Sequence, residues 1–311
     1  MDQYNINLLK NAFIKISSLI RFGNQINLAE KNNSLNQSGD FVKKLDILSH
    51  EIIVDQIKKS HNIVGYISEE SQNIVFTNYK ENLESLESME DYSDQRYIIA
   101  FDPLDGSSNI DSNITTGTIF AIYEYNISKN KLTDIISSGY CLYGPATILV
   151  MNDEIMDVNM YQLNKENVFD FIKKLDFNQI ESQKVYSVNE SYFNLFDSET
   201  KKLVLNYKDN NYNHRYIGSM VSDCHRVFIQ GGVFMYPKNE KKPKGKIRVL
   251  YEALPFAFLF INANGYATDT PKNEKINIID KYFEPNGIKL ENFYIHNSTP
   301  IFLSSELLLL V

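Results

Sequence analysis

Two aspartates, Asp102 and Asp105, are the residues of this chain best suited to chemistry, because they stand on either side of Pro103, three positions apart. Proline fixes φ near the value that a turn requires, so this spacing predicts a turn in which both carboxylates face one point. Directly after them, residues 106–108 offer backbone N–H groups and serine hydroxyls, which bind phosphate at tight turns and helix starts. Carboxylate oxygens are the ligands that Mg²⁺ prefers. The pattern therefore predicts a Mg²⁺-dependent site for phosphoryl chemistry.

Further acidic residues stand beside the ends of predicted strands or helices in three other parts of the chain. They are Asp40 with Asp46, Glu69 with Glu70, and Glu252. Hydrolysis of a phosphate monoester requires charge neutralisation on the phosphoryl oxygens and a water made nucleophilic, and metal ions held by shared carboxylates supply both. Several acids must then converge from distant positions. The histidines show no metal-ligand spacing, and the sequence contains neither a cysteine nucleophile motif nor a Walker or dinucleotide-binding loop.

Hydrophobic patterns predict the elements that must position these acids. Apolar residues recur at helical spacing over residues 6–22 and again over 45–53. Buried strands are expected at 63–67 and 97–101, each directly before an acidic pair. We also expect strands at 117–123, 140–151, 233–236 and 247–251, helices at 168–175 and 253–262, a mobile loop at 24–39, and a solvated acidic helix or insertion at 80–95. This mixture predicts a layered α/β protein.

The composition limits the class of protein. A chain of 311 residues, of which 43% are hydrophobic, can bury a large core, and we expect two lobes, formed by residues 1–177 and 178–311. The net charge of −8 argues against nucleic-acid binding. Two cysteines fit a reducing compartment without disulfides. Because the sequence has neither a signal-peptide pattern nor an apolar run of about 20 residues, we expect a cytoplasmic protein that does not bind membranes.

A longer set of motifs resembles class I fructose-1,6-bisphosphatase over nearly the whole chain after about residue 8. In order along the chain, these motifs occupy residues 39–46, 68–70, 101–111, 140–144, 186–190, 215–220, 231–237 and 245–252. The Asp-Pro-Leu-Asp-Gly sequence alone resembles the wider superfamily of lithium-sensitive sugar and inositol phosphatases, whereas the ordered set is specific. The resemblance implies a layered αβαβα sugar-phosphatase fold, with most metal ligands in the first lobe and the 6-phosphate contacts in the second.

The resemblance also implies an activity and a role for each site residue. The chain would hydrolyse the 1-phosphate of fructose 1,6-bisphosphate in gluconeogenesis, with two to three Mg²⁺ ions that Mn²⁺ can replace. The metal ligands would be Glu69, Glu70, Asp102, the carbonyl of Leu104, Asp105 and Glu252. Glu70 and Asp46 would polarise the attacking water, and Asp40 would belong to a loop that closes over the site.

The substrate residues follow from the same resemblance. Gly106, Ser107 and Ser108 would receive the departing phosphate, and Met220 would contact the sugar. The retained 6-phosphate would be bound by Asn189, Tyr216, Tyr236 and Lys246. Arg215 matches an arginine that reaches into a neighbouring subunit's site, which implies a homo-oligomer, a tetramer or a dimer.

Departures from the family pattern concern regulation. Glu124 stands where regulated members have an arginine that contacts AMP, Arg96 replaces a lysine there, and the chain begins where their AMP-binding loop would lie. An acidic side chain repels a phosphate. We therefore expect an enzyme that AMP does not inhibit or that responds to another effector. A further departure is Ser191, where a glycine is common after Asn-Glu.

Two alternatives to this activity stay open at the level of sequence. Residues 139–144 favour the fructose enzyme, but Pro145 is more typical of sedoheptulose-1,7-bisphosphatases, so that activity or a dual specificity is the nearest alternative. The other is a non-catalytic descendant that binds sugar phosphates or a protein partner. Loss of a metal carboxylate would indicate such a descendant, and all of the expected carboxylates are present.

Overall fold

The computed structural model describes residues 3–22, 31–35, 41–77, 96–152, 155–271 and 277–308. Asp40 and the acidic segment 80–95 lie outside the described residues. Within those ranges, the helices are all too short or too polar to cross a membrane. The two cysteines, Cys141 and Cys224, are buried and free, as expected.

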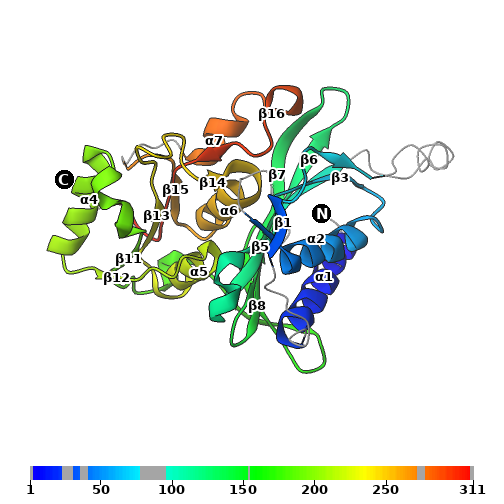
Figure 1. Cartoon of the computed structure of the whole chain (residues 1–311), viewed down its shortest axis with the longest axis horizontal. Helices are drawn as coiled ribbons and strands as arrows, with labels where there is room; N and C mark the ends of the chain where they lie inside the picture. Colours follow the sequence, from blue (N-terminus) through cyan, green and yellow to red (C-terminus); the bar gives the residue numbers. More distant parts are fainter. Residues whose placement is uncertain are drawn as a thin grey trace.

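The larger sheet runs in the order β10-β9-β8-β7-β6-β5-β3-β4, with β16 paired to β7 (Figure 1). Its strands are β3 (Ile63–Ser68), β4 (Val75–Phe76), β5 (Tyr97–Asp105), β6 (Thr116–Asn126), β7 (Lys131–Tyr143), β8 (Thr147–Asn152), β9 (Val158–Leu163), β10 (Phe169–Lys174) and β16 (Ile288–Lys289). Strands β3 and β5 are parallel, and their predicted positions are confirmed. Both are buried along their whole length, which is consistent with the apolar stretches at 63–67 and 97–101.

Helices cover both faces of this sheet. Ile99 and Phe101 of β5 pack in one cluster with α1 (Gln3–Phe22) and α2 (Lys44–Ile57), whereas Ile98 and Ala100 pack on the opposite face with α6 (Leu254–Asn262). This alternation is the period of two that a strand imposes on its side chains. All three helices were predicted from the sequence and are confirmed.

A second sheet, in the order β12-β11-β13-β18-β15, packs on the other side of α6. It consists of β12 (Asn213–His214), β11 (Val185–Ser187), β13 (Val233–Tyr236), β18 (Ile301–Ser304) and β15 (Tyr266–Thr268). Phe234 of β13 contacts the cluster around α6, while Val233 and Met235 face α4 (Ser198–Asp209). The layers are therefore helix, sheet, helix, sheet, helix, which confirms the expected αβαβα arrangement (Figure 1).

The remaining elements are short or lie between these layers. They are β1 (Lys31–Leu35), β2 (Phe41–Lys43), α5 (Met220–Gln230), β14 (Ile247–Arg248), α7 (Ile278–Phe283) and β17 (Ser298–Thr299), the 3₁₀ turns η1 (Ser107–Ser112), η2 (Phe177–Gln179), η3 (Glu190–Leu195) and η5 (Leu290–Asn292), and the π-helical turn η4 (Val249–Ala253). The division into lobes of residues 1–177 and 178–311 stays a prediction.

Residues 168–175 form the edge strand β10, so the predicted helix there is wrong. Their apolar residues do recur at helical spacing, but a hairpin to β9 overrides that pattern. The side chain of Asn164 accepts hydrogen bonds from the backbone N–H groups of Glu166 and Val168, and Asn167 has a φ of 60°. These contacts close the turn between β9 and β10, so that the residues after it pair with β9 in the sheet.

Two further predictions need correction. Within the expected loop at 24–39, Lys31–Leu35 forms strand β1, which pairs antiparallel with β2, whereas residues 24–30 and 36–39 lie outside the described residues. The expected strand at 247–251 ends after Arg248, and the chain enters the π-helical turn η4. In η4 the hydroxyl of Tyr123 donates to the Leu250 carbonyl over 2.6 Å, a long-range contact that a single-sequence pattern cannot show.

Candidate active site

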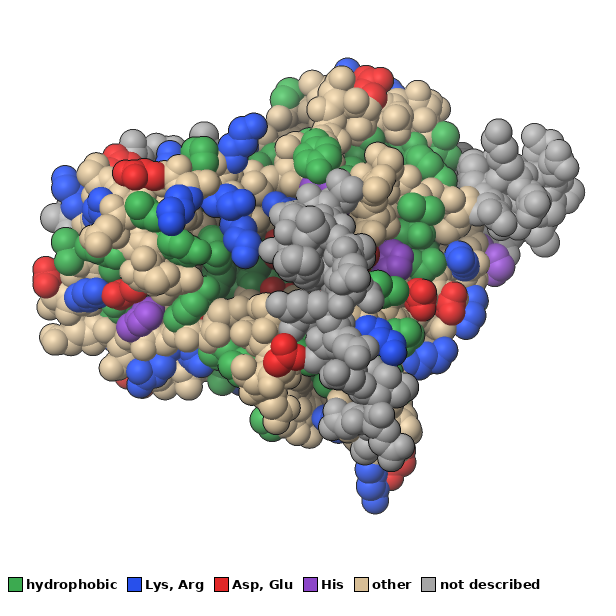
Figure 2. All heavy atoms as spheres, viewed as in Figure 1, with side chains coloured by type: hydrophobic (Ala, Val, Ile, Leu, Met, Phe, Trp, Pro, Cys, Tyr) green, Lys and Arg blue, Asp and Glu red, His purple; other side chains and the backbone are tan. Residues whose placement is uncertain are grey.

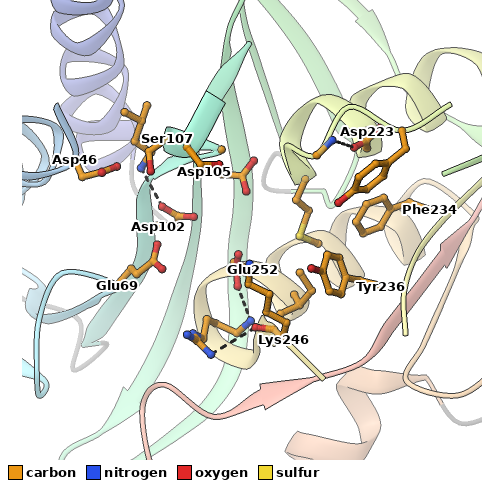
Figure 3. A pocket seen from close by; sticks show the side chains of 18 of the residues that line it. Asp46, Glu69, Asp102, Asp105, Ser107, Asp223, Phe234, Tyr236, Lys246 and Glu252 are labelled. Carbon is orange, nitrogen blue, oxygen red and sulfur yellow. Dashed lines mark hydrogen bonds between the residues drawn. The ribbon is translucent and has the colours of Figure 1, made fainter. Parts of the chain in front are cut away.

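Most of the predicted site residues line one pocket of about 440 Å³, between the larger sheet and the C-terminal elements (Figure 3). Its predicted members are Asp46, Glu69, Glu70, Asp102, Leu104, Asp105, Gly106, Ser107, Ser108, Tyr216, Met220, Tyr236, Lys246 and Glu252. Asp46, Glu69, Asp102 and Asp105 lie at one end of the pocket, Asp223, Phe234 and Tyr236 lie at the other, and Glu252 and Lys246 lie between them (Figure 3).

Asp102 and Asp105 stand at the end of β5, which continues through Pro103 instead of turning there. The strand bulges against β6, since Asp102 pairs with Ile119 and Asp105 pairs with Gly117. The bulge brings both carboxylates into the pocket. The predicted turn at Pro103 is therefore wrong, although both carboxylates do face one point, as expected. The backbone N–H of Leu104 donates to Asp102 over 2.9 Å.

The Glu69–Glu70 pair reaches the same pocket because β3 is parallel to β5. Ser68 pairs with Phe101 in register, and the N–H of Glu69 donates to the Phe101 carbonyl over 3.2 Å. The acidic residues that follow the two strands therefore meet at one edge of the sheet. Asp46 approaches this edge from α2, where it is buried in the first turn.

Asp102, Asp105 and Glu252 form a cluster that fits a divalent cation. Each offers a carboxylate oxygen, and these oxygens lie within 4.8 Å of one another. Burial and the charge of Glu69 raise the pKa of Glu252 to about 8, and burial raises the pKa of Asp105 to about 6. Burial, followed by repulsion from Glu69, Asp105 and Glu252, also raises the pKa of Asp102 well above its usual range. A cation bound to these hard oxygen donors would relieve the repulsion.

The N-terminus of α5 supports Asp105 from the opposite side. The hydroxyl of Ser219 and the backbone N–H of Val221 both donate to one oxygen of Asp105 over 2.9 Å. Such N–H groups have no partner inside the helix, and the helix dipole favours a negative charge there. Gly106 follows with a φ of 76°, and a Cβ on it would lie 2.8 Å from that of Ser219. Glycine at this position lets the turn at residues 106–108 pack against α5.

Family models agree with this architecture in both halves of the chain. The model described as the N-terminal domain of fructose-1-6-bisphosphatase matches residues 4–174, and the model of its C-terminal domain matches residues 180–283.

The chain belongs to the fructose-1,6-bisphosphatase family.

Individual members of the fructose-1,6-bisphosphatase family align over most of the chain. Fructose-1,6-bisphosphatase isozyme 2 of Bos taurus is 36% identical over 277 residues, which cover 85% of this chain and 78% of the relative. The class 1 enzyme of Sulfurihydrogenibium sp. is 35% identical over 314 residues, which cover 96% of this chain and 86% of that enzyme. The crystal structure of the Leishmania major enzyme in holo form superimposes with a TM-score of 0.79 at 28% identity, over 98% of this chain and 92% of that one. The chain is therefore a phosphatase enzyme, and the predicted resemblance is confirmed.

Three residues expected from the bisphosphatase pattern do not line the main pocket. Asn189 lies beside it, in a smaller cavity shared with Tyr236, and hydrogen-bonds to Tyr216. Arg215 is exposed and donates to the carbonyl of His214 over 3.1 Å. Asp40 lies outside the described residues.

The pocket also contains residues to which the sequence analysis gave no role. They are Asp111, Gly218, Asp223, Phe234, Ile247 and Arg248. Asp223 is buried in the first turn of α5, where it accepts hydrogen bonds from the N–H groups of Ile217 and Gly218 over 3.0 Å. It thereby orders the loop that carries Tyr216. The sequence signal was present, because Ser219 followed by an acid in the first turn is typical of a helix start.

Proposed function

We propose that the chain hydrolyses the 1-phosphate of fructose 1,6-bisphosphate to give fructose 6-phosphate and phosphate. The observation that carries this proposal is how the polar groups are distributed along the main pocket. Asp102, Asp105 and the turn at residues 106–108 stand at one end, Tyr236 stands at the other, and Lys246 lies between them beside Glu252, with Tyr216 also lining the pocket. Such a pocket suits a substrate that has two phosphates, of which one is removed and one is retained.

The basic character of the second end extends beyond Lys246. The chain between β13 and β14 contains five exposed lysines, Lys238, Lys241, Lys242, Lys244 and Lys246. In the space-filling view, several Lys and Arg side chains lie on the half of the face that contains these strands (Figure 2). This positive charge attracts an anionic substrate towards the pocket.

We assign the chemistry to groups of this chain. Glu70 and Asp46 would accept the proton of the attacking water, and the turn formed by Gly106, Ser107 and Ser108 would donate hydrogen bonds to the departing phosphate. Glu69, Asp102, the Leu104 carbonyl, Asp105 and Glu252, together with Glu70, would hold two to three Mg²⁺ or Mn²⁺ ions. When bound, these ions would neutralise the phosphoryl oxygens and lower the pKa of water.

We assign the substrate contacts in the same way. Asn189, Tyr216, Tyr236 and Lys246 would bind the 6-phosphate, and Met220 would contact the sugar. Arg215 would complete a neighbouring subunit's site in a homo-oligomer, and Asp40 would close over the bound substrate. The cytoplasmic location and the place in gluconeogenesis are part of the same proposal.

We also propose that AMP does not inhibit the enzyme. Glu124 is the cross-strand partner of Asp134, so two carboxylates stand side by side where an AMP phosphate would approach. Glu124 is further held by the hydroxyl of Thr133, which donates to its carboxylate over 2.7 Å. An assay with AMP in the millimolar range should show full activity, and a sub-millimolar inhibition constant would contradict the proposal.

Phosphate release from two substrates tests the main proposal. The purified chain is incubated with fructose 1,6-bisphosphate or sedoheptulose 1,7-bisphosphate, with and without Mg²⁺, and kcat/KM is compared because specificity is a ratio of these values. We expect the larger kcat/KM for the fructose substrate. The opposite ratio would assign the chain to the sedoheptulose activity, and no release from either would favour a non-catalytic descendant.

A further inference from the structure

One buried histidine connects two of the acidic turns that form the cation site. The hydroxyl of Tyr251 lies 2.6 Å from Nδ1 of His296, and Nε2 of His296 lies 2.8 Å from the carbonyl oxygen of Ser71. Tyr251 directly precedes Glu252, and Ser71 directly follows the Glu69–Glu70 pair. His296 is only 4% exposed, so solvent does not compete for these bonds.

The hydrogen-bond directions are fixed by the chemistry of the partners. A carbonyl oxygen can only accept, so Nε2 of His296 donates to Ser71, and in the neutral ring Nδ1 accepts the hydroxyl proton of Tyr251. The imidazole ring of His296 thus links Tyr251 to Ser71 through one hydrogen bond at each nitrogen, and the rigid ring sets the distance between these two partners. It joins segments that are 180 positions apart in sequence, from Ser71 to Tyr251.

The turn around Glu252 is π-helical. A π-helical turn is rare and is found mostly at functional sites. Each of the two turns is anchored on its own side of the sheet. Tyr123 donates to the Leu250 carbonyl over 2.6 Å, and the Ser68 hydroxyl lies 2.9 Å from Nδ1 of His50. The His296 bridge adds a direct link from one turn to the other.

We propose that His296 is a positioning residue of the cation site, which holds the Glu252 turn and the Glu69–Glu70 turn at the separation that a shared divalent cation requires. This inference rests on the proposed function only in so far as that function uses the same cation site. It predicts that loss of the bridge weakens cation binding and leaves the substrate contacts largely unchanged.

A second Tyr–His pair in the same molecule provides a matched control. The hydroxyl of Tyr140 lies 2.8 Å from Nδ1 of His225, with ring centroids 5.9 Å apart and planes at 75°. For Tyr251 and His296 the centroids are also 5.9 Å apart, and the angle is 76°. Both tyrosine rings are fully buried. Neither Tyr140 nor His225 lines the described pocket.

The experiment compares Tyr251→Phe with Tyr140→Phe in the full chain. Mn²⁺ affinity is measured without substrate, from the electron paramagnetic resonance signal of free Mn²⁺. We expect Tyr251→Phe to weaken Mn²⁺ binding by about ten-fold to a hundred-fold, the range found when outer partners of metal ligands are removed. Tyr140→Phe should leave the affinity unchanged. At saturating Mn²⁺, the substrate KM of both variants should stay within about two-fold of the wild type.

His296 itself is tested with two substitutions. His296→Phe removes both hydrogen bonds, whereas His296→Gln keeps a donor near the Ser71 carbonyl and should recover part of the Mn²⁺ affinity. Wild-type affinity in Tyr251→Phe would overturn the proposal, and so would an equal loss in both tyrosine variants. A wild-type chain that binds Mn²⁺ but releases no phosphate would refute the proposed function alone. One that binds no Mn²⁺ would overturn the present inference as well.

Discussion

The two ends of the pocket are built on different physical principles. At the acidic end, formed by Asp102, Asp105 and Glu252, the carboxylates meet close together, and their pKa values are raised. At the tyrosine–lysine end, Tyr216 and Tyr236 are half-buried and Lys246 is exposed. Charge repulsion therefore destabilises the acidic end, and a bound cation would offset it, whereas the exposed Lys246 needs no such compensation.

This difference separates what each end contributes to a reaction. Groups that hold the reacting phosphate and the cations act on the transition state, so changes there lower kcat. Groups that bind a retained phosphate contribute the same binding energy in the ground state and in the transition state. Substitution of such a group therefore raises KM and leaves kcat unchanged. The predictions below test this separation, beginning with the largest expected effect.

Removal of divalent cations should abolish turnover completely. Without a cation, the carboxylates of the acidic end repel one another, and the departing phosphate lacks charge neutralisation. Activity is measured after treatment with a chelator and again after addition of Mg²⁺ or Mn²⁺, which should restore it. Ca²⁺ provides a control for the effect of charge alone. Turnover that persists after thorough removal of metal would contradict the role assigned to the acidic end.

Glu70→Gln should lower kcat by about 10²-fold to 10⁴-fold, the contribution typical of a general base. The substitution keeps the size of the side chain but removes the charge that would activate water. The substrate KM should change little, because the tyrosine–lysine end is intact. Glu51→Gln, at an exposed position on α2, serves as the control. Near-normal turnover of Glu70→Gln would remove this residue from the mechanism.

Lys246→Ala should raise KM for the bisphosphate by about ten-fold to a hundred-fold, the effect of losing a charge-assisted hydrogen bond of roughly 1.5–3 kcal/mol. The kcat should stay within a few-fold of the wild type. Lys244→Ala is a matched control, since this exposed lysine lies two positions away and outside the described pocket. A fall in kcat without a change in KM would show that the two ends are not separate.

Glu252→Gln should raise the melting temperature of the metal-free chain at neutral pH by a few degrees, because burial and the charge of Glu69 raise the pKa of Glu252 to about 8, so folding opposes the ionisation of this carboxyl, whereas an amide does not ionise. The same substitution should weaken cation binding. Thermal unfolding is followed in the presence of a chelator, and Glu240→Gln, which changes an exposed acid, is the control. A lower melting temperature for Glu252→Gln would mean that its hydrogen bond with the Arg248 N–H outweighs the repulsion.

The metal-side residues could be predicted because they follow local patterns. An uninterrupted apolar run ending in acids marks Glu69 and Glu70 after β3, and the same pattern marks Asp102 and Asp105 on β5. Even so, the expected turn at Pro103 became a bulge, since pairing with β6 decides the local backbone. The helix predicted at residues 168–175 was wrong for the same reason, because the hairpin with β9 overrides their helical spacing.

The helix-start pattern marks Asp223, but the tertiary contacts of Asp223 and His296 could not be predicted from the sequence. Asp223 acts on backbone N–H groups of a loop, and His296 bridges two turns through Tyr251 and Ser71. No periodicity encodes such contacts, because the partners come from separate elements that meet only after the layers have packed.

The sequence by itself determined the chemical character of this protein. It placed hard oxygen donors beside a phosphate-binding turn, in motifs that indicate a sugar bisphosphatase, and it determined which strands are buried. The family resemblance already grouped Glu252 with Asp102 and Asp105, but only the tertiary structure brought their carboxylate oxygens within 4.8 Å of one another and joined the turns around them through His296. The physical reason is that residue types specify what a group can bind, whereas the distances between groups far apart in sequence depend on how the sheets and helices pack.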